Sequence, residues 1–528
     1  MSGLNDLIDR FLSDFLPREP RVRPGQARKK IIRDAVWGMI QLEPHEAILV
    51  DTPLFQRLRG IFQTGFTYLV YPCAVHTRFE HSLGCLHVAS RILDSLAQKI
   101  KDDEHCPPIS DQERLTVRLA ALLHDISHCI FSHVSEGIYE NDPRVVQATD
   151  SLRAMFPEGE RDSRKIGAAE VIAYSIVTSR RFTAFFQQVR STVGPGDLPS
   201  DVELEDAARI IVGLPPKKHQ DRHYLTQIVN GPFDADKLDY QARDGHFTGI
   251  GFRVDIERLL ASLCIVPERL KGSFLAVDHR GVAAVEQLLF NRMLLYDSVY
   301  HHHKNRAAAR LFKQRAAASK GLSLDWLLLH DEYDFFSGRD VDDPALIELA
   351  KALRQRNLPC RAVVLHPATM NRWDDEWGRM AAKYFSDDER DRKQVLKWVE
   401  TLCQEINSEF GESSVPEVFF DLPTPPRFQD LQRLTYLKYA DDREPILLND
   451  VFPFTSTVNS YAQQAKYRMY VFAWRADCER VAAAAFKVFK RHKIELNEQA
   501  FRLAKLDLNE IQRLTGEAIP KRVPRTGH

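Results

Sequence analysis

The stretch LLHDISHCIFSH at residues 122–133 carries three histidines and one aspartate directly after an apolar run. Apolar residues at helical spacing lead into it: Leu115, Leu119, Leu122 and Leu123. This spacing predicts an amphipathic helix that ends beside His124. Because neighbouring residues of a helix diverge by roughly 100°, the imidazole of His124 and the carboxylate of Asp125 can approach one ion from two sides. A His-Asp pair alone is common by chance, so other segments decide what this pair does.

Two further segments carry side chains of the kinds that bind metals: RFEH at residues 78–81 and FDADKLDYQARD at residues 233–244. The order His81, then His124 with Asp125, then Asp236 resembles the motif of the HD superfamily of metal-dependent phosphohydrolases. The resemblance implies that these residues hold one divalent ion. Imidazoles and carboxylates together suit Mn, Mg, Fe, Zn or Ni and leave coordination positions for water and phosphate oxygens. The sequence therefore predicts a divalent metal cofactor without identifying the ion.

The resemblance extends through DTPLFQRLRGIFQTGFTYLVYPCAVHTRFEHSLG at residues 51–84 and continues to NRMLLYDSVYHHH at residues 291–303. These segments look like the deoxynucleoside triphosphate (dNTP) triphosphohydrolase branch, which contains bacterial dGTPases and the vertebrate SAM-and-HD-domain dNTPase. The resemblance implies hydrolysis of a dNTP to a deoxynucleoside and tripolyphosphate, after attack at the α-phosphorus.

The resemblance also implies catalytic roles for His128, His133 and Glu136. Both imidazoles would approach the phosphates, and His133 matches the histidine proposed as general acid at O5′. Glu136 stands where the family usually has an aspartate that orients this histidine. The alternative is that both histidines are hydrogen-bonded residues at a helix end. RKIGA at residues 164–168 stands where the SAM-containing enzyme has a His-Glu pair, so a second active-site histidine is missing.

Substrate contacts follow from the same resemblance. Arg78, Lys237 and Arg292 match residues that bind the triphosphate, and Gln63, Tyr240, Asp244 and Tyr300 match residues on the sugar side. Fixed cations suit the triphosphate because it carries about four negative charges. Gln63 would read the sugar 3′-OH, and Tyr300 would leave no room for a 2′-OH. Thr64 and Tyr296 depart from the family pattern, so base preference and discrimination against ribonucleotides are not predicted.

An activating nucleotide is suggested by Asp51, Gln56 and Arg59, which match residues that bind guanine nucleotide in the vertebrate enzyme. Arg33 and Ala35 replace the asparagine and proline of that pattern, so the effector could differ or be absent. Because such sites form between subunits in the family, the resemblance implies a homo-oligomer.

The chain is expected to be mainly α, with an HD-domain helical core and a smaller α/β C-terminal subdomain. We divide it into an N-terminal arm and linker at 1–30, a phosphohydrolase domain at 31–320 and a C-terminal module at 321–528. Helical periodicity dominates up to about residue 315. KYRMYVFAW at residues 466–474 has the aromatic and β-branched character of a strand, and a helical pattern follows it.

Composition excludes several classes of function. Lys and Arg number 72 against 73 Asp and Glu, so no global field holds nucleic acid or an anionic membrane. Two short basic blocks, KRHK at 490–493 and PKRVPR at 520–525, support nucleic-acid binding only weakly. No apolar run of about 18 residues exists and the N-terminus lacks the pattern of a secretory signal, so we expect a cytoplasmic, non-membrane protein. Eight scattered cysteines without a CxxC pair indicate free thiols.

Two rival functions remain at this point. One is an HD phosphodiesterase that acts on another nucleotide or on single-stranded nucleic acid, and the sugar-side residues argue against it. The other is a nucleotide sensor that keeps the metal site without turnover, and the histidine missing near Arg164 motivates it.

Overall fold

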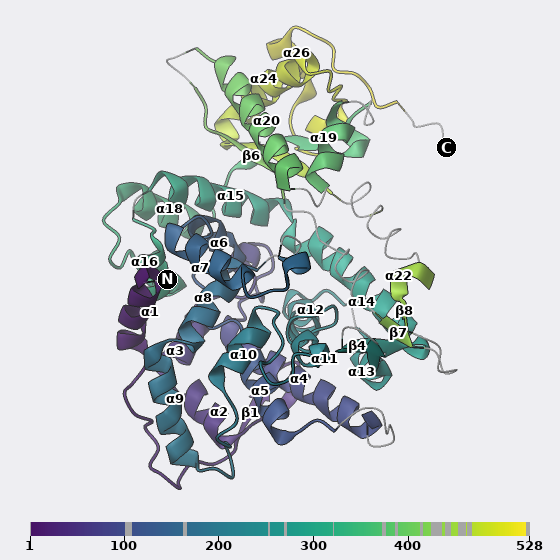
Figure 1. Ribbon diagram of the computed structural model, residues 1–528. Coiled ribbons are helices and arrows are strands. Elements are labelled where there is room, and N and C mark those ends of the chain that lie inside the picture. Colours follow the sequence, from purple (N-terminus) through teal and green to yellow (C-terminus); the bar gives the residue numbers. More distant parts are fainter. Residues whose placement is uncertain are drawn as a thin grey trace. The chain divides into compact units, whose positions relative to one another are not determined.

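Helices make up most of the fold, as the computed structural model shows for residues 2–100, 108–161, 166–251, 254–268, 272–319, 321–371, 376–385, 389–411, 415–423, 436–438, 445–451, 461 and 467–523. The chain forms two compact units (Figure 1). The first unit combines Met1–Arg292, Ala316–Ile347 and Phe428–Thr455, and the second combines Met293–Arg315, Glu348–Arg427 and Ser456–His528. Each unit gathers separate stretches of sequence, so the domain boundaries at residues 30 and 320 stay predictions.

The helices that lie wholly or mainly in the first unit range from 4 to 23 residues in length. They are α1 (Ser2–Phe15), α2 (Pro44–Val50), α3 (Pro53–Gln56), α4 (Arg78–Ile100), α5 (Asp111–Leu123), α6 (His133–Tyr139), α7 (Pro143–Arg153), α8 (Ala168–Val177), α9 (Arg180–Val193), α10 (Leu204–Ile211), α11 (His223–Gln227), α12 (Ala235–Thr248), α13 (Ile256–Ser262), α14 (Val282–Leu295), α16 (Leu324–Leu329), α17 (Glu332–Ser337) and α22 (Leu448–Val451). Helix α4 packs against both α5 and α12. His81 lies on α4, His124 and Asp125 directly follow α5, and Asp236 lies on α12.

Local sequence explains where these three helices begin and how they pack. Ser110 caps α5 through a reciprocal pair of hydrogen bonds with Glu113, and α5 ends at Leu123 as its apolar spacing predicts. Gly84 lets α12 approach α4, because a side-chain carbon at that position would collide with the carboxylate of Asp239. The absence of a side chain at Gly84 therefore brings the ligand-bearing faces of α4 and α12 together.

The N-terminal helix α1 packs within the first unit. Its apolar face is buried against α7, α8, α9 and α16, and the buried side chains are Leu4, Leu7, Ile8, Phe11 and Leu12. Each such side chain stabilises the fold by about 1.5–3 kcal/mol when fully buried. The expected N-terminal arm therefore contains a helix that forms part of the first core.

Two small sheets occur in the first unit, and their strands β1 to β4 lie in the stretch where helical periodicity dominates the sequence. Strands β1 (Lys30–Asp34) and β2 (Gly38–Leu42) form an antiparallel hairpin. Strands β3 (Leu263–Glu268) and β4 (Gly272–Asp278) pair antiparallel, and β7 (Tyr436–Lys438) and β8 (Ile446–Leu447) extend this sheet. Strand β1 has no fully buried residue, so it lacks the alternating pattern that identifies a strand in a sequence.

The second unit contains the α/β subdomain that the sequence predicts. Strands β5 (Cys360–Leu365), β9 (Met469–Ala473) and β6 (Val418–Asp421) form an antiparallel sheet with β9 in the centre. Every residue of β9 is buried, which explains its continuous apolar sequence. The helices of this unit are α15 (His303–Ala318), α18 (Pro344–Arg354), α19 (Glu376–Phe385), α20 (Glu389–Ser408), α24 (Cys478–Arg491), α25 (Gln499–Arg502) and α26 (Leu508–Thr515). The predicted fold class is confirmed.

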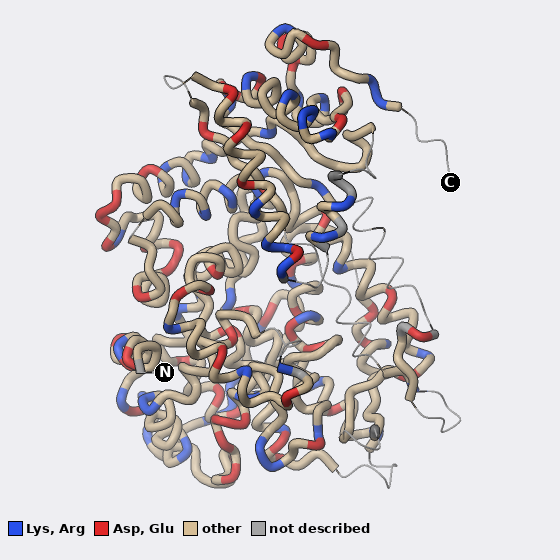
Figure 2. Tube along the Cα trace, turned by 45° about the horizontal axis from the view of Figure 1, so that its top comes forward, with Lys and Arg blue, Asp and Glu red and all other residues tan. Residues whose placement is uncertain are grey.

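Charged residues of both signs are interspersed along both units (Figure 2). Among the described residues, no helix combines the length and apolar character needed to cross a membrane. The cysteines in the described part of the chain are all free thiols.

Candidate metal centre

The loop after α5 has an unusual backbone. Phe131 and Ser132 both adopt positive φ angles, 56° and 51°, which cost energy for residues with side chains. The Glu332 carboxylate at the start of α17 stabilises this turn, because one of its oxygens accepts hydrogen bonds from the backbone N–H groups of Phe131 and Phe62, each at 2.9 Å. The turn ends at His133, the first residue of α6. A carboxylate distant in sequence therefore sets the direction in which α6 leaves the loop.

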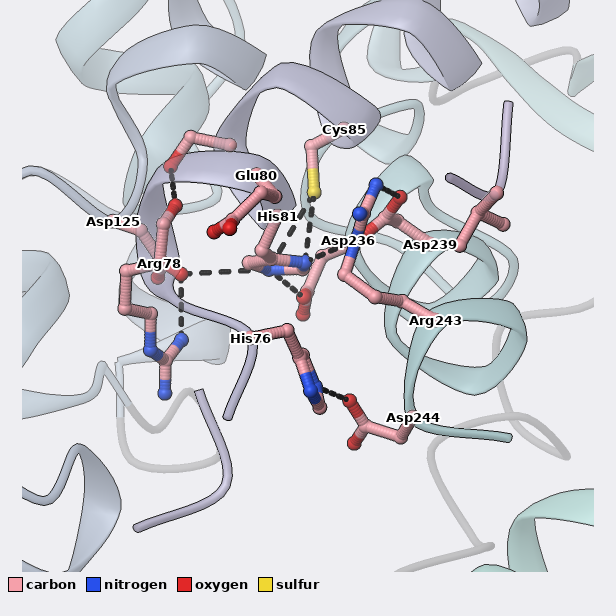
Figure 3. A network of polar contacts seen from close by, with 12 residues as sticks. His76, Arg78, Glu80, His81, Cys85, Asp125, Asp236, Asp239, Arg243 and Asp244 are labelled. Atoms are coloured by element: carbon pink, nitrogen blue, oxygen red, sulfur yellow. Dashed lines mark hydrogen bonds and ion pairs between the residues drawn. The ribbon is translucent and has the colours of Figure 1, made fainter. Parts of the chain in front are cut away.

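His81 lies at the centre of a buried polar network on α4 (Figure 3). Its Nδ1 atom lies 2.7 Å from Oδ2 of Asp239, and its Nε2 atom lies 3.0 Å from Oδ1 of Asp236. Oδ2 of Asp125 lies 3.4 Å from the same Nε2 atom. The contact with Asp239 places the proton on Nδ1, so Nε2 is the atom that offers a lone pair to a metal.

His124 presents the same nitrogen. Its Nδ1 atom donates to the carbonyl of Ala121 at 2.8 Å, while its Nε2 atom is buried and has no hydrogen-bond partner among the described residues. Oδ1 of Asp125 lies 3.4 Å from this Nε2 atom. A buried nitrogen lone pair without a hydrogen-bond donor destabilises the folded state, and a bound cation removes this cost by accepting the lone pair. This observation shows that the side chains present fit a divalent ion.

Asp125 connects the candidate metal-binding side chains to the guanidinium group of Arg78. Nη1 of Arg78 donates to Oδ2 of Asp125 at 2.5 Å, and both side chains are buried. Burial alone would raise the pKa of Asp125, but Arg78 and the neighbouring imidazoles hold that pKa well below its ordinary value. Nη2 of Arg78 is buried and has no hydrogen-bond partner among the described residues. Arg78 therefore keeps one donor available beside the cluster.

The network behind His81 reaches the β1–β2 hairpin. Asp239 accepts from Arg243 at 2.9 Å and from the indole Nε1–H of Trp37 at 2.5 Å. Arg243 also pairs with Asp34 at 2.8 Å, and the Oδ1 atom of Asp34 accepts from the backbone N–H of Trp37. The turn of the hairpin thus holds the carboxylate that orients His81. The sequence analysis did not identify Asp34, Trp37, Asp239 or Arg243 as site residues; only the position of Asp239, three residues after Asp236 on a helix, could have indicated it.

Cys85 is a further residue that the sequence analysis did not identify. It lies one helical turn after His81 and is buried. The side chains of His81, Cys85, His124 and Asp236 each offer a ligand atom, and these atoms all lie within 4.8 Å of one another. Four side chains within this distance could hold a metal ion.

His128, His133 and Glu136 form a second group beside Asp125. Nε2 of His128 lies 3.1 Å from Oδ1 of Asp125, and Nδ1 of His133 lies 3.2 Å from Oε1 of Glu136. The side chain of His133 is 72% exposed, whereas His128 is buried. Desolvation and the nearby Arg78 lower the pKa of His128 to about 4. Desolvation opposes the charge on His133, but Glu136 outweighs it and raises the pKa of His133 above its ordinary value.

The predicted phosphate-binding cations fall into two places. Arg78 lies in the cluster, as described above. Nζ of Lys237 on α12 donates to the carbonyl of Gly231 at 3.0 Å and to the carboxylate of Asp234. Arg292 on α14 lies close enough to Lys237 to act on its pKa. Two of the three predicted phosphate-binding cations are therefore neighbours.

The predicted sugar-side residues are only partly brought together. Oε1 of Gln63 is buried and has no hydrogen-bond partner in the described part of the chain. Asp244 on α12 is buried and lies 2.7 Å from Nε2 of His76. Tyr240 is half-buried on the same helix. Tyr300 belongs to the second unit, so its role beside the sugar stays a prediction.

The predicted activator residues share one exposed surface of the first unit. Nζ of Lys30 lies 2.7 Å from Oδ1 of Asp51. Gln56 donates to the carbonyl of Val50 at 2.8 Å and accepts from Nε of Arg59 at 2.8 Å. These contacts bring Asp51, Gln56 and Arg59 into one region. Arg164 and Lys165, which stand where the family has a second histidine, lie outside the described residues.

Comparison with known families assigns the fold around this cluster. Residues 78–182 match the HD domain, and residues 254–500 match the HD associated region. The first match contains His81, His124 and Asp125. The chain contains an HD domain and an HD associated region. Asp236 lies between the two matched ranges of this HD-domain protein. The family resemblance recognised in the sequence is thereby confirmed.

Several relatives of this HD-domain protein have recorded names. It is 32% identical to the deoxynucleoside triphosphate triphosphohydrolase SAMHD1 of Bos taurus over 285 residues, which cover 52% of this chain and 45% of the bovine protein. The human SAMHD1 is 32% identical over 280 residues, which cover 52% of this chain and 42% of the human protein. An uncharacterized protein of Methanocaldococcus jannaschii is 29% identical over 333 residues, which cover 62% of this chain and 58% of that protein. The chain spans about half the length of these curated relatives.

A solved structure shares the fold. The crystal structure of a hypothetical protein from Aquifex aeolicus matches with a TM-score of 0.57 and 21% identity, covering 87% of this chain and 100% of that one. At this identity the match supports the fold alone.

Proposed function

We propose that this HD-domain protein is a metal-dependent dNTP triphosphohydrolase that releases a deoxynucleoside and tripolyphosphate. The observation that carries the proposal is the position of Asp125, which contacts His81, His124 and His128 at 3.4, 3.4 and 3.1 Å. One carboxylate thereby joins the metal-binding group to the group that handles protons. SAMHD1 relatives bear the name of this activity, which supports the choice of substrate class.

The metal would be held by His81, His124, Asp125 and Asp236. The nitrogen and oxygen atoms that face one another are 3.0–3.4 Å apart, which matches the spacing of ligands that share one ion at about 2.1 Å. A bound divalent ion polarises a phosphoryl oxygen and lowers the pKa of a bound water. Asp236 is 36% exposed, so substrate oxygens can approach the site from its side.

Arg78 binds the phosphate next to this centre. Its pairing with Asp125 fixes the guanidinium plane, and the unused Nη2 donor is aimed at a phosphate oxygen. Lys237 and Arg292 add positive charge for the remaining phosphates. Each contact strengthens as charge develops on the α-phosphate, so the cations favour the transition state over the ground state.

His133 donates the proton that the leaving deoxynucleoside needs at O5′. Its exposed ring is accessible to substrate, and Glu136 raises its pKa above the ordinary value, which favours the protonated form. Its neighbour His128 has a pKa of about 4 and remains neutral, so its Nε2–H donates to Asp125 and the ring does not compete as an acid. The two imidazoles therefore have different roles because their surroundings differ.

The sugar contacts proposed within the first unit are Gln63, Tyr240 and Asp244. The buried Oε1 atom of Gln63 has no hydrogen-bond donor among the described residues. The 3′-OH of a deoxyribose can donate to it. Asp51, Gln56 and Arg59 bind an activating nucleotide, and subunits associate around it. These assignments follow the HD-domain dNTPases that the chain resembles.

A product assay tests the reaction. Purified protein is incubated with Mn²⁺ or Mg²⁺ and each dNTP, singly and in mixtures, and products are separated by chromatography. Release of deoxynucleoside with tripolyphosphate supports the proposal, and faster turnover in mixtures supports the activator site. Hydrolysis of oligonucleotides with no attack on any dNTP would establish a phosphodiesterase instead. Nucleotide binding without product under every metal would establish a sensor.

A further inference from the structure

Cys85 faces the metal cluster from the turn of α4 that follows His81. Residues four apart on a helix lie on the same face, one above the other. Figure 3 shows the sulfur of Cys85 directed toward the ring of His81. Its Sγ atom lies 3.5 Å from Nε2 and 3.6 Å from Nδ1 of that imidazole. The thiol therefore lies against the ring of His81, almost equally far from its two nitrogens.

The spacing of the sulfur agrees with that of a ligand. Metal–sulfur and metal–nitrogen bonds of about 2.3 and 2.1 Å give a tetrahedral ligand separation of about 3.6 Å. The Sγ to Nε2 separation of 3.5 Å is close to this value. The ligand atoms of Cys85, His124 and Asp236 also lie within 4.8 Å of one another. The buried, unsatisfied Nε2 atom of His124 faces the same space and independently indicates a cation there.

Cys129 provides the contrast. It is equally buried and lies in the loop that carries His124 and Asp125, but its Sγ atom donates to the carbonyl of Ser127 at 3.6 Å. It is not among the grouped ligand atoms of the described residues. Two thiols in one site region thus have different surroundings, and only Cys85 faces metal-binding groups.

We propose that Cys85 is a sulfur ligand of the metal centre, in addition to the histidines and aspartates. The inference rests on the metal site of the proposed function. On coordination the S–H bond breaks, the proton passes to solvent and the sulfur lone pair forms the metal–sulfur bond, with no change in oxidation state. Sulfur ligands favour Zn²⁺, Fe²⁺ and Co²⁺ over the harder Mg²⁺ and Mn²⁺. The centre therefore selects a softer divalent ion than its nitrogen and oxygen ligands alone would select.

Cobalt substitution tests the assignment on the full chain. The metal-free protein is titrated with Co²⁺, bound metal is measured by elemental analysis, and the absorption spectrum is recorded. We expect a sulfur-to-cobalt charge-transfer band in the near ultraviolet for the wild type. Cys85→Val and Cys85→Ser should lose this band and still bind cobalt, with a decrease in Zn²⁺ affinity of about tenfold relative to Mn²⁺. Cys129→Val should retain both the band and the metal preference.

The outcomes separate this inference from the proposed function. Cobalt bound in the wild type without a charge-transfer band would overturn the role of Cys85 and leave the metal site intact. Retention of the band in Cys85→Val, or its loss in Cys129→Val, would also overturn the assignment. Failure of the wild type to bind cobalt, with no difference from Asp125→Ala, would overturn the metal site and the inference together. Because the wild-type spectrum alone is decisive, the test does not depend on a variant that folds.

Discussion

The surroundings of His81 and of Asp51 differ in how their charges are satisfied. Around His81 every carboxylate has a buried partner, and Asp239 alone binds His81, Arg243 and Trp37. Around Asp51 the charges are exposed, since the side chains of Lys30 and Asp51 are 46% and 51% accessible. Both regions belong to the first unit. The side chains around His81 are therefore preorganised, whereas the exposed side chains around Asp51 can change conformation.

Desolvation explains this difference. A buried charge without a partner is costly, so each group around His81 is held in one geometry by hydrogen bonds. An exposed ion pair contributes little and can rearrange around a ligand. The buried group thus suits a resident ion, and the exposed group suits a nucleotide that comes and goes. Four experiments test this contrast.

The largest effect is expected for Asp125→Asn. The amide keeps the shape of the side chain but loses the charge that pairs with Arg78 and faces both imidazoles. We expect dNTP hydrolysis to fall by at least about a thousandfold and bound metal to be lost. Chromatographic product assays and elemental analysis measure the two effects. A folded variant with metal and activity near wild type would show that the cluster is not the active centre.

Glu136→Gln should reduce activity by about a hundredfold and change its pH dependence. Glu136 raises the pKa of His133, and the proposed acid must be protonated to act. The rate therefore falls as pH rises through the pKa of His133. Without the carboxylate that pKa drops, so the alkaline limb of the profile should move to lower pH. Rates measured across a pH series give the midpoint, and an unmoved alkaline limb would exclude His133 as the acid.

Trp37→Phe should have a moderate effect on metal binding. The change removes only the indole N–H that donates to Asp239, and Asp239 in turn orients His81. We expect metal affinity to weaken by about tenfold. Titration calorimetry with Mn²⁺ measures it. Trp326→Phe is the matched control, because that indole donates to the carbonyl of Asp340 at 3.2 Å; an equal loss in both variants would exclude a specific role for the hairpin.

The smallest effect is expected for Lys30→Ala at the exposed surface. Loss of its pair with Asp51 should change the free energy of unfolding by no more than about 0.5 kcal/mol. The buried comparison is Glu46→Gln, which leaves Arg118 without its charged partner at 2.6 Å and should cost about 3 kcal/mol. Urea denaturation measures both. Similar losses in the free energy of unfolding for Lys30→Ala and Glu46→Gln would contradict the distinction between buried, preorganised charges and exposed ones.

The helices were predictable because their period is local. Apolar residues every three or four positions identified α1 and α5, and the continuous apolar run identified β9. The β1–β2 hairpin was missed because its exposed first strand carries no alternating pattern. The order of histidines and aspartates along the chain predicted candidate metal ligands. It did not predict the residues that orient them, such as Asp239 and Trp37.

By itself the sequence determined the fold class and carried the motif by which the HD domain is recognised, since these depend on residue type, period and order. Only the tertiary structure decided that Asp239 and Trp37 hold His81, that Glu332 stabilises the turn before His133, and that Cys85 faces the cluster. These contacts join residues that lie apart on different elements. Hydrogen bonds and ligand geometry act over about 3 Å, so such partners become visible only when the helices have packed.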